Sequence, residues 1–280
     1  MDVFELHCHS TASDGSLSPA ALVEYAAARG MTTLALTDHD TLDGLAEAAK
    51  ATEQHSIRLI AGTEISVKAP TGSMHLLAYL PSLAPEPLQA RMQAIGDYRG
   101  TRNERIVARL CELGYPIEWA DVARRAKGRV GRPHIAATLL DAGHVATIQE
   151  AFDELLADGK PAYVDAGSLG PLEAVKLVCE SGGLAVLAHP YTLRLADAAL
   201  ARFVAELVDA GLAGIECHRP DHDASERART LKLAQAHDLL ALGGSDWHGR
   251  PSDPALGSSG ETSVSNEALE ALLSISRTSS

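Results

Sequence analysis

Short apolar runs alternate with longer stretches of helical periodicity along most of the chain. The apolar runs predict seven strands, at 3–9, 32–40, 58–67, 74–80, 183–190, 212–218 and 239–248. Helical patterns lie between most of them, at 18–30, 42–54, 171–181, 198–210 and 223–237. In the first helix Ser18 can cap the N-terminus, Pro19 suits the first turn and Gly30 suits the position after the end. This alternation predicts an α/β fold with a parallel sheet, and seven strands favour closure into a barrel.

The connection between the fourth and fifth predicted strands is much longer than one crossover helix requires. It runs through residues 81–182 and contains four further helical patterns that each end in glycine, at 102–114, 118–128, 133–143 and 147–159. We therefore predict a small helical insertion domain at 100–165 that covers the substrate, with the barrel formed by 1–99 and 166–280. The Ser/Thr-rich C-terminal end is expected to be frayed.

Composition narrows the classes of partner. The 280 residues are 46% apolar and 22% charged, as in ordinary globular proteins. A formal charge of −13 argues against binding of long nucleic acid, although bound cations would still let the site accept small phosphorylated molecules. The four cysteines match no metal or redox spacing. Without a secretory signal or an apolar run long enough to cross a membrane, the chain is expected to be cytoplasmic, with no membrane partner.

Metal-compatible side chains lie at or near the ends of six of the seven predicted strands. The set is His7, His9, Asp14, His39, Glu64, His75, His189, Asp246 and His248. Any one of these could be a buried structural histidine or a capping carboxylate, but six of the 12 histidines fall in these segments. The carboxyl ends of parallel barrel strands converge on one face, so the set is expected to meet there; His75 is the exception, because it begins its strand. Nine ligands exceed the four that one zinc ion takes, which predicts two or three ions sharing Glu64 or Asp246.

The motifs HCHSTASDG, TDHDT, GTEIS, AHP and SDWH, in this order, resemble the PHP (polymerase and histidinol phosphatase) family, which is related to the amidohydrolases. The resemblance implies a distorted (β/α)7 barrel of the TIM type with a trinuclear metal centre, commonly of manganese, iron or zinc. It implies a first ion held by His7, His9 and Asp246. Glu64 would bridge to a second ion, completed by His75 and His189. The third ion would be held by Asp14, His39 and His248.

The segment GRPHIA at 131–136 resembles the branch of this family that acts on nucleoside 3′,5′-bisphosphates. That resemblance implies removal of the 3′-phosphate, as in the conversion of pAp to AMP and phosphate. The same group includes enzymes that trim short RNA from its 5′ end, and histidinol phosphate is a further family substrate. We expect a metal-bridging hydroxide to attack phosphorus in line, with two to three divalent ions, manganese first among the candidates.

The second phosphate of a bisphosphate needs its own partners, which the insertion can supply. The cationic candidates there are Arg99, Arg102, Arg105, Arg129, Arg132, His134 and Lys160. Arg132 and His134 lie at the start of a predicted helix, where backbone N–H groups favour an anion, and Arg102 is the third residue we assign to substrate binding. Arg105 and Arg129 fit better as solvated side chains.

Two other classes of protein are compatible with parts of this pattern. Related barrels hydrolyse C–N bonds with similar ligands, and a single zinc ion per chain would favour that reaction. A regulatory module with an inactive metal site is the non-enzymatic alternative. It fits less well, because every ligand position is filled.

Overall fold

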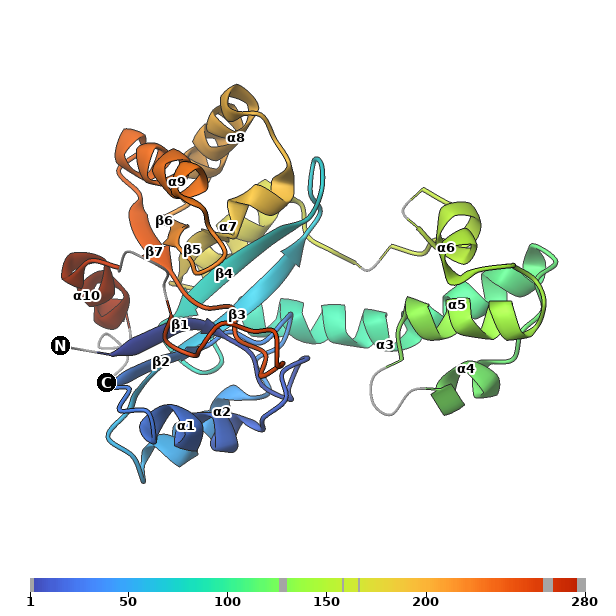
Figure 1. The fold of residues 1–280 in the computed structure, drawn as a ribbon, viewed down its shortest axis with the longest axis horizontal. Coiled ribbons are helices and arrows are strands. Elements are labelled where there is room, and N and C mark those ends of the chain that lie inside the picture. The colour runs from blue at the N-terminus through green and yellow to red at the C-terminus, as the bar shows by residue number, and fades with distance from the viewer. Residues whose placement is uncertain (1–2, 126–129, 158, 166, 259–263, 276–280) are drawn as a thin grey trace. The chain divides into compact units, whose positions relative to one another are not determined.

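The computed structural model describes residues 3–125, 130–157, 159–165, 167–258 and 264–275, apart from the side chains of residues 99 and 100. The chain divides into two compact units (Figure 1). The first combines Met1–Gln93 with Leu169–Ser280, and the second is Ala94–Ser168. Helix α3 (Leu88–Glu112) contributes residues to both units.

The first unit is built on a curled seven-stranded sheet in which the strands follow their order in the sequence (Figure 1). The strands are β1 (Phe4–Cys8), β2 (Thr33–Leu36), β3 (Arg58–Val67), β4 (Met74–Leu80), β5 (Leu184–Ala188), β6 (Gly214–His218) and β7 (Leu240–Gly243). All seven predicted strands exist, but the expectation of a wholly parallel sheet is wrong at β4, which runs antiparallel to β3 and β5. Residues 68–73 form the link from β3 to β4, which is too short for a parallel crossover.

The first strand and the segment after the last strand lie side by side. Cys8 and Trp247 form a parallel bridge, and the His9 amide donates to the Trp247 carbonyl at 2.9 Å. Gly244 permits this approach, because a Cβ added there would lie 2.5 Å from the His7 Cβ. The two ends of the sheet are therefore joined at the edge where β1 ends.

Five helices connect the strands of the first unit: α1 (Pro19–Ala27), α2 (Leu45–Thr52), α7 (Pro171–Glu180), α8 (Asp197–Asp209) and α9 (Ala224–Ala236). The α1 caps are those that the sequence predicts. The Ser18 hydroxyl accepts a hydrogen bond from the Ala21 amide at 3.2 Å, Pro19 opens the helix, and Gly30 follows its end with φ of +74°.

The interior of the curled sheet is filled by apolar side chains and covered by a C-terminal helix that the sequence did not predict. Helix α10 (Asn266–Ile275) places Leu269, Leu272 and Leu273 in the same buried cluster as Leu6, Tyr79 and other sheet residues. The expectation of a frayed end is therefore wrong for residues 266–275, whereas residues 276–280 lie outside the described part of the chain. Apolar residues at helical spacing outweigh the Ser/Thr-rich composition around them.

The second unit is helical. After the shared helix α3 come α4 (Trp119–Arg125), α5 (Arg132–Asp141), α6 (Ile148–Ala151) and a π-helical turn at Phe152–Leu156. Its own core includes Ile106, Leu110, Val122, Ile135, Leu139 and Leu156. The sequence places the start of the first of these helices at 102, whereas α3 begins at Leu88.

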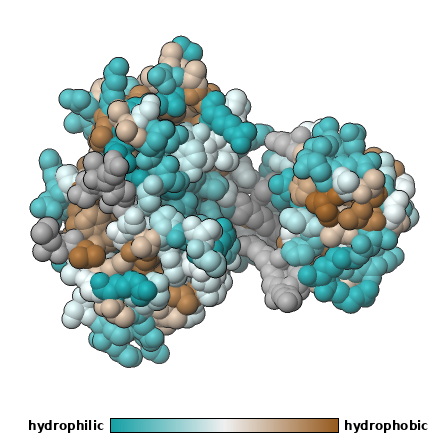
Figure 2. Space-filling model, in the orientation of Figure 1, coloured by the Kyte–Doolittle hydropathy of each residue, from teal (hydrophilic) through white to brown (hydrophobic). Residues whose placement is uncertain are grey.

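Hydrophilic residues cover most of the visible surface of each unit, with apolar residues in smaller groups (Figure 2). Among the described residues, no helix combines the length and apolar character that a membrane span requires. None of the four cysteines forms a disulfide; Cys8 and Cys217 are buried, and Cys111 and Cys179 are exposed.

Candidate metal centre

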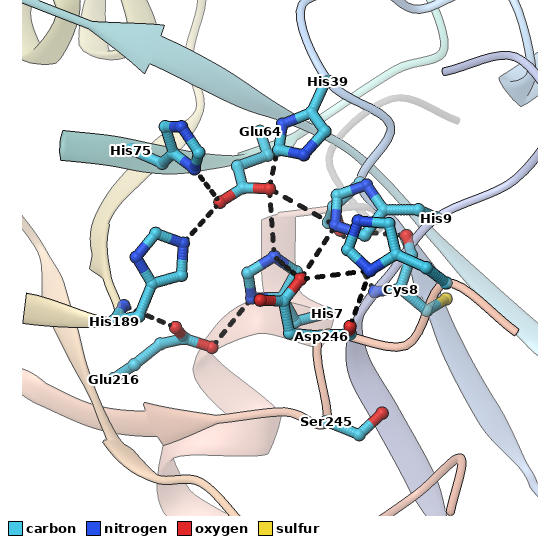
Figure 3. A network of polar contacts seen from close by, with 12 residues as sticks. His7, Cys8, His9, His39, Glu64, His75, His189, Glu216, Ser245 and Asp246 are labelled. Carbon is cyan, nitrogen blue, oxygen red and sulfur yellow. Dashed lines mark hydrogen bonds and ion pairs between the residues drawn. The ribbon is translucent and has the colours of Figure 1, made fainter. Parts of the chain in front are cut away.

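All nine predicted metal ligands lie in the first unit, at one edge of the sheet. Figure 3 shows the imidazoles of His7, His9, His39, His75 and His189 arranged around the carboxylate of Glu64. His7 and His9 come from β1 and its end, His39 follows β2, and Glu64 lies in β3. His189 follows β5, and Asp246 and His248 follow β7. His75 joins this edge because β4 is antiparallel, so its start pairs with Ala188 at the end of β5.

Glu64 is the centre of the arrangement. Its side chain is 0% exposed and contacts five imidazoles. Oε1 lies 2.8 Å from both His75 Nδ1 and His189 Nε2. Oε2 faces three further nitrogens, with distances of 3.2 Å to His7 Nε2, 3.3 Å to His9 Nε2 and 3.1 Å to His39 Nδ1. A single carboxylate in β3 thus links imidazoles that come from β1, β2, β4 and β5.

Two more carboxylates, those of Asp246 and Asp14, lie beside this core. Asp246 Oδ1 lies 3.2 Å from His9 Nε2 and 3.3 Å from His7 Nε2. Asp14 Oδ1 lies 3.2 Å from His248 Nε2, and Asp14 Oδ2 accepts a hydrogen bond from Arg250 at 2.9 Å. The rings of His9 and His248 stack with centroids 4.1 Å apart.

Three groups of these side chains could each hold one metal ion, because their ligand atoms lie within 4.8 Å of one another. The groups are His7–His9–Glu64–Asp246, His9–Asp14–His39–His248, and His39–Glu64–His75. They share His9, His39 and Glu64. The ligand sets implied by the family resemblance differ in detail: His9 and His39 each belong to two of these groups, and His189 reaches the centre through Glu64.

Several nitrogen and oxygen atoms of this cluster are buried without a hydrogen bond, which is what a binding site for divalent cations requires. His7 Nε2, His9 Nδ1, His39 Nδ1 and Glu64 Oε2 are buried and make no hydrogen bond, although His7 Nε2 and His39 Nδ1 lie within 3.2 Å of Glu64 Oε2. Buried polar atoms are rarely left in this state. Imidazole nitrogens and carboxylate oxygens are the usual ligands of zinc, manganese and iron in proteins, so this cluster fits a site for such ions.

Burial and charge set the protonation of this cluster. Burial raises the pKa of Glu64 and Asp246, but the adjacent histidines, above all His7, outweigh it and hold both well below their ordinary values. Burial lowers the pKa of His9, yet its contacts with Asp246 and Glu64 raise it to about 9. At His39 burial prevails over the attraction of Glu64 and lowers the pKa to about 4.

One buried acid at the centre was missed by the sequence interpretation. Glu216 in β6 is 0% exposed, and its Oε1 lies 3.0 Å from His7 Nδ1. Burial raises the pKa of Glu216, but Arg219 and His7 together lower it to about 2. The available signal was a glutamate inside the strand pattern LAGIECH, where it follows the apolar run LAGI; a charged residue there is typical of a side chain with a specific buried partner.

Two of the candidate ligands have strained backbones. His189 has φ of +26° and Asp246 has φ of +56°, in the left-handed region that favours glycine. Such conformations persist where the surroundings hold them, and they concentrate at functional sites. The His189 side chain contacts Glu64, and the Asp246 side chain contacts His7 and His9.

The three residues predicted to bind substrate lie in the second unit, and each contacts that unit's own backbone. Arg102 Nε donates to the Val164 carbonyl at 2.7 Å, and Arg132 Nη1 donates to the Leu156 carbonyl at 3.1 Å. His134 Nδ1 accepts from the Gly131 amide at 3.0 Å, at the start of α5. Among the other cationic candidates, the Arg99 side chain and Arg129 lie outside the described residues.

Several curated proteins match most of the chain, and two of them have different named activities. It is 33% identical over 245 residues to a 5′-3′ exoribonuclease of Haemophilus influenzae, covering 88% of this chain and 89% of the relative. It is also 33% identical over 250 residues to a 3′,5′-nucleoside bisphosphate phosphatase of Chromobacterium violaceum, covering 87% and 86%. The two matches are equally strong, so similarity alone does not separate the two named activities.

A solved structure gives the same architecture. An amidohydrolase of Chromobacterium violaceum, with bound sulfate and no metal, superposes with a TM-score of 0.72 at 30% identity, covering 98% of this chain and 96% of that one. The model of the PHP domain matches residues 5–157, which include His7, His9, Asp14, His39, Glu64 and His75. Together with the geometry around Glu64, these matches show that the chain belongs to the PHP domain family.

Proposed function

We propose that the chain is a metal-dependent phosphoesterase that removes the 3′-phosphate of nucleoside 3′,5′-bisphosphates such as pAp. The observation that carries the proposal is the convergence of five imidazoles on the buried carboxylate of Glu64, with Asp14 and Asp246 grouped with the same histidines. This donor set is too large for one ion and suits a cluster of two or three. Manganese is the first candidate, with iron and zinc as alternatives.

The three groups of side chains described above would hold these ions. Divalent cations there would neutralise the oxygens of a phosphate ester and lower the pKa of bound water toward neutrality. Phosphate esters resist hydrolysis because their anionic oxygens repel nucleophiles, so a site of concentrated positive charge supplies the stabilisation that this reaction needs most.

The chain gives the centre a closed side and an open side. His7, His9 and Glu64 have side chains with no exposure, whereas the side chains of Asp14 and His75 are 46% and 27% exposed. Substrate would approach from the side of Asp14, His39 and His75.

Both comparisons support a phosphorylated substrate. One relative is named as a bisphosphate phosphatase, and sulfate, which is bound in the related amidohydrolase structure, has the tetrahedral shape of phosphate. The assignment of Arg102, Arg132 and His134 to the second phosphate stays a prediction.

A 5′-to-3′ exoribonuclease acting on short RNA is the second candidate, favoured by the match to the Haemophilus influenzae enzyme. Both reactions break a phosphate ester at the ribose 3′ oxygen. In the bisphosphate phosphatase reaction this phosphate carries no other substituent. In the exoribonuclease reaction the phosphate is also joined to the next nucleotide. A rival hydrolysis of C–N bonds would need only a single zinc ion.

The proposal is tested by incubating the manganese-loaded protein with pAp, with histidinol phosphate and with a 5′-phosphorylated pentaribonucleotide. We expect rapid phosphate release from pAp that is lost in His9→Ala. Release of mononucleotides from the oligomer without turnover of pAp would instead establish the exoribonuclease. A protein that holds one zinc ion and cleaves none of the three would contradict both.

A further inference from the structure

Glu216 contacts two of the candidate ligands, His7 and His189, without belonging to any of the three groups that could hold an ion. We propose that Glu216 is a positioning residue that fixes the tautomer of His7 and so presents His7 Nε2 to a metal ion. The inference rests on the proposed metal-dependent function and adds a residue that acts through a ligand.

The His7 ring is enclosed, and its two nitrogens have different surroundings. Nδ1 lies 3.0 Å from Glu216 Oε1, while Nε2 makes no hydrogen bond and lies 3.2 Å from Glu64 Oε2 and 3.3 Å from Asp246 Oδ1. A carboxylate only accepts hydrogen bonds, so the Nδ1 that faces Glu216 carries a hydrogen. In the neutral ring the lone pair is then on Nε2, the nitrogen directed at the ligand cluster.

Glu216 is itself held so that it cannot turn away (Figure 3). Its Oε2 accepts from the His189 amide at 2.7 Å and from Arg219 Nη1 at 3.0 Å. Arg219 is fixed in turn by two hydrogen bonds to Asp221, of 2.9 and 3.0 Å. The same carboxylate therefore orients a ligand from β1 and the backbone of the ligand that follows β5.

Glu216→Gln tests this arrangement because glutamine has almost the same shape. Two donors, the His189 amide and Arg219, require an oxygen at the Oε2 position. The amide NH2 must then face His7 Nδ1 and donate to it, which moves the ring hydrogen to Nε2. His7 would present a hydrogen instead of a lone pair to the metal site. Loss of such a supporting hydrogen bond typically weakens metal binding by about 10–100-fold.

The experiment counts manganese ions per folded chain and measures their affinities in the wild type, in Glu216→Gln and in the matched control Asp221→Asn. Asp221 also binds Arg219 but contacts no ligand imidazole. We expect Glu216→Gln to lose one ion, or to bind it about 10–100-fold more weakly, and to keep the ion of the group that contains Asp14 and His248. Asp221→Asn should keep the full complement.

Wild-type affinity for every ion in Glu216→Gln would overturn the inference and leave the proposed function standing. Equal loss in Asp221→Asn would overturn it too, because the effect would then belong to the Arg219 network as a whole. A wild-type chain that binds no manganese would overturn the proposed function and this inference together.

A measurement on the wild type covers the case in which Glu216→Gln does not fold. In zinc-loaded protein with 15N-labelled histidine, the ring assigned to His7 should show a protonated Nδ1 and an unprotonated Nε2. A His7 ring with its hydrogen on Nε2 would contradict the proposed role of Glu216.

Discussion

Cys8 and Trp247 form a parallel bridge that joins the end of the first strand to the segment after the last. This bridge sets His7 and His9 beside Asp246 and His248, which lie far away in the sequence. The His9 Nε2–Asp246 Oδ1 distance of 3.2 Å is a direct result. The metal centre therefore depends on closure of the sheet at this one place.

Gly244→Ala should damage both the fold and the centre. An added Cβ would lie 2.5 Å from the His7 Cβ and 2.8 Å from Glu5 Oε1, so the two sheet ends would have to move apart. Overpacking of this kind costs about 1–3 kcal/mol. We expect the free energy of unfolding to fall by this amount in chemical denaturation, together with weaker manganese binding. Gly96→Ala is the control, since its Cβ would meet nothing within 4 Å; a loss of similar size there would remove the steric explanation.

Glu64→Gln should prevent metal binding by the two groups of side chains that share this carboxylate. The substitution keeps the size of the side chain but removes the charge that five imidazoles contact. We expect a fall of about 100-fold or more in phosphate release and loss of more than one ion per chain. The exposed residue Glu53 provides the control Glu53→Gln, which should behave as the wild type. Activity within a few-fold of the wild type in Glu64→Gln would show that this carboxylate is not a bridge.

Metal binding should release protons at neutral pH. The pKa of His9 is raised to about 9 in the metal-free cluster, so below that pH the ring carries a proton that a metal ion must displace. Affinity should therefore rise as the pH increases toward about 9, by about tenfold per pH unit for each proton released. Calorimetry at pH 7.5 in buffers of different ionisation enthalpy measures this release. Binding heats that do not depend on the buffer would contradict it.

Manganese should stabilise the folded chain by mass action. A ligand at a hundred times its dissociation constant adds about 2.7 kcal/mol when it binds only the folded state. We expect the melting temperature to rise with manganese and to fall when a chelator is added, with a much smaller response in Glu64→Gln. An equal response in both proteins would place the stabilising ion elsewhere.

Much of the barrel could be predicted because its signals are local. Ser18, Pro19 and Gly30 mark the limits of α1, and the helix forms between them. The nine candidate ligands could be predicted to lie together because they recur at strand ends, and the structure brings all nine to one edge of the sheet; that they bind metal stays a prediction. What each ligand contacts depends on the three-dimensional arrangement and had to come from the structure.

The sequence interpretation was wrong or incomplete where the outcome depends on tertiary contacts. In the parallel sheet that the sequence predicts, His75 lies at the wrong end of its strand for a ligand. Because β4 is antiparallel, the start of this strand lies at the same edge as the other candidate ligands. Helix α10 was obscured by its Ser/Thr-rich neighbours, although Leu269, Leu272 and Leu273 fill the core. Glu216 was missed because its role depends on His7 and Arg219, which only folding brings to it.

The central claim is that one carboxylate gathers several ions for phosphate chemistry, and anomalous diffraction tests it most directly. Crystals loaded with manganese should show two or three peaks at the metal edge within ligand distance of the side chains around Glu64, at least two of them shared by its carboxylate. A single peak that does not involve Glu64, or no peak at this edge of the sheet, would contradict the account.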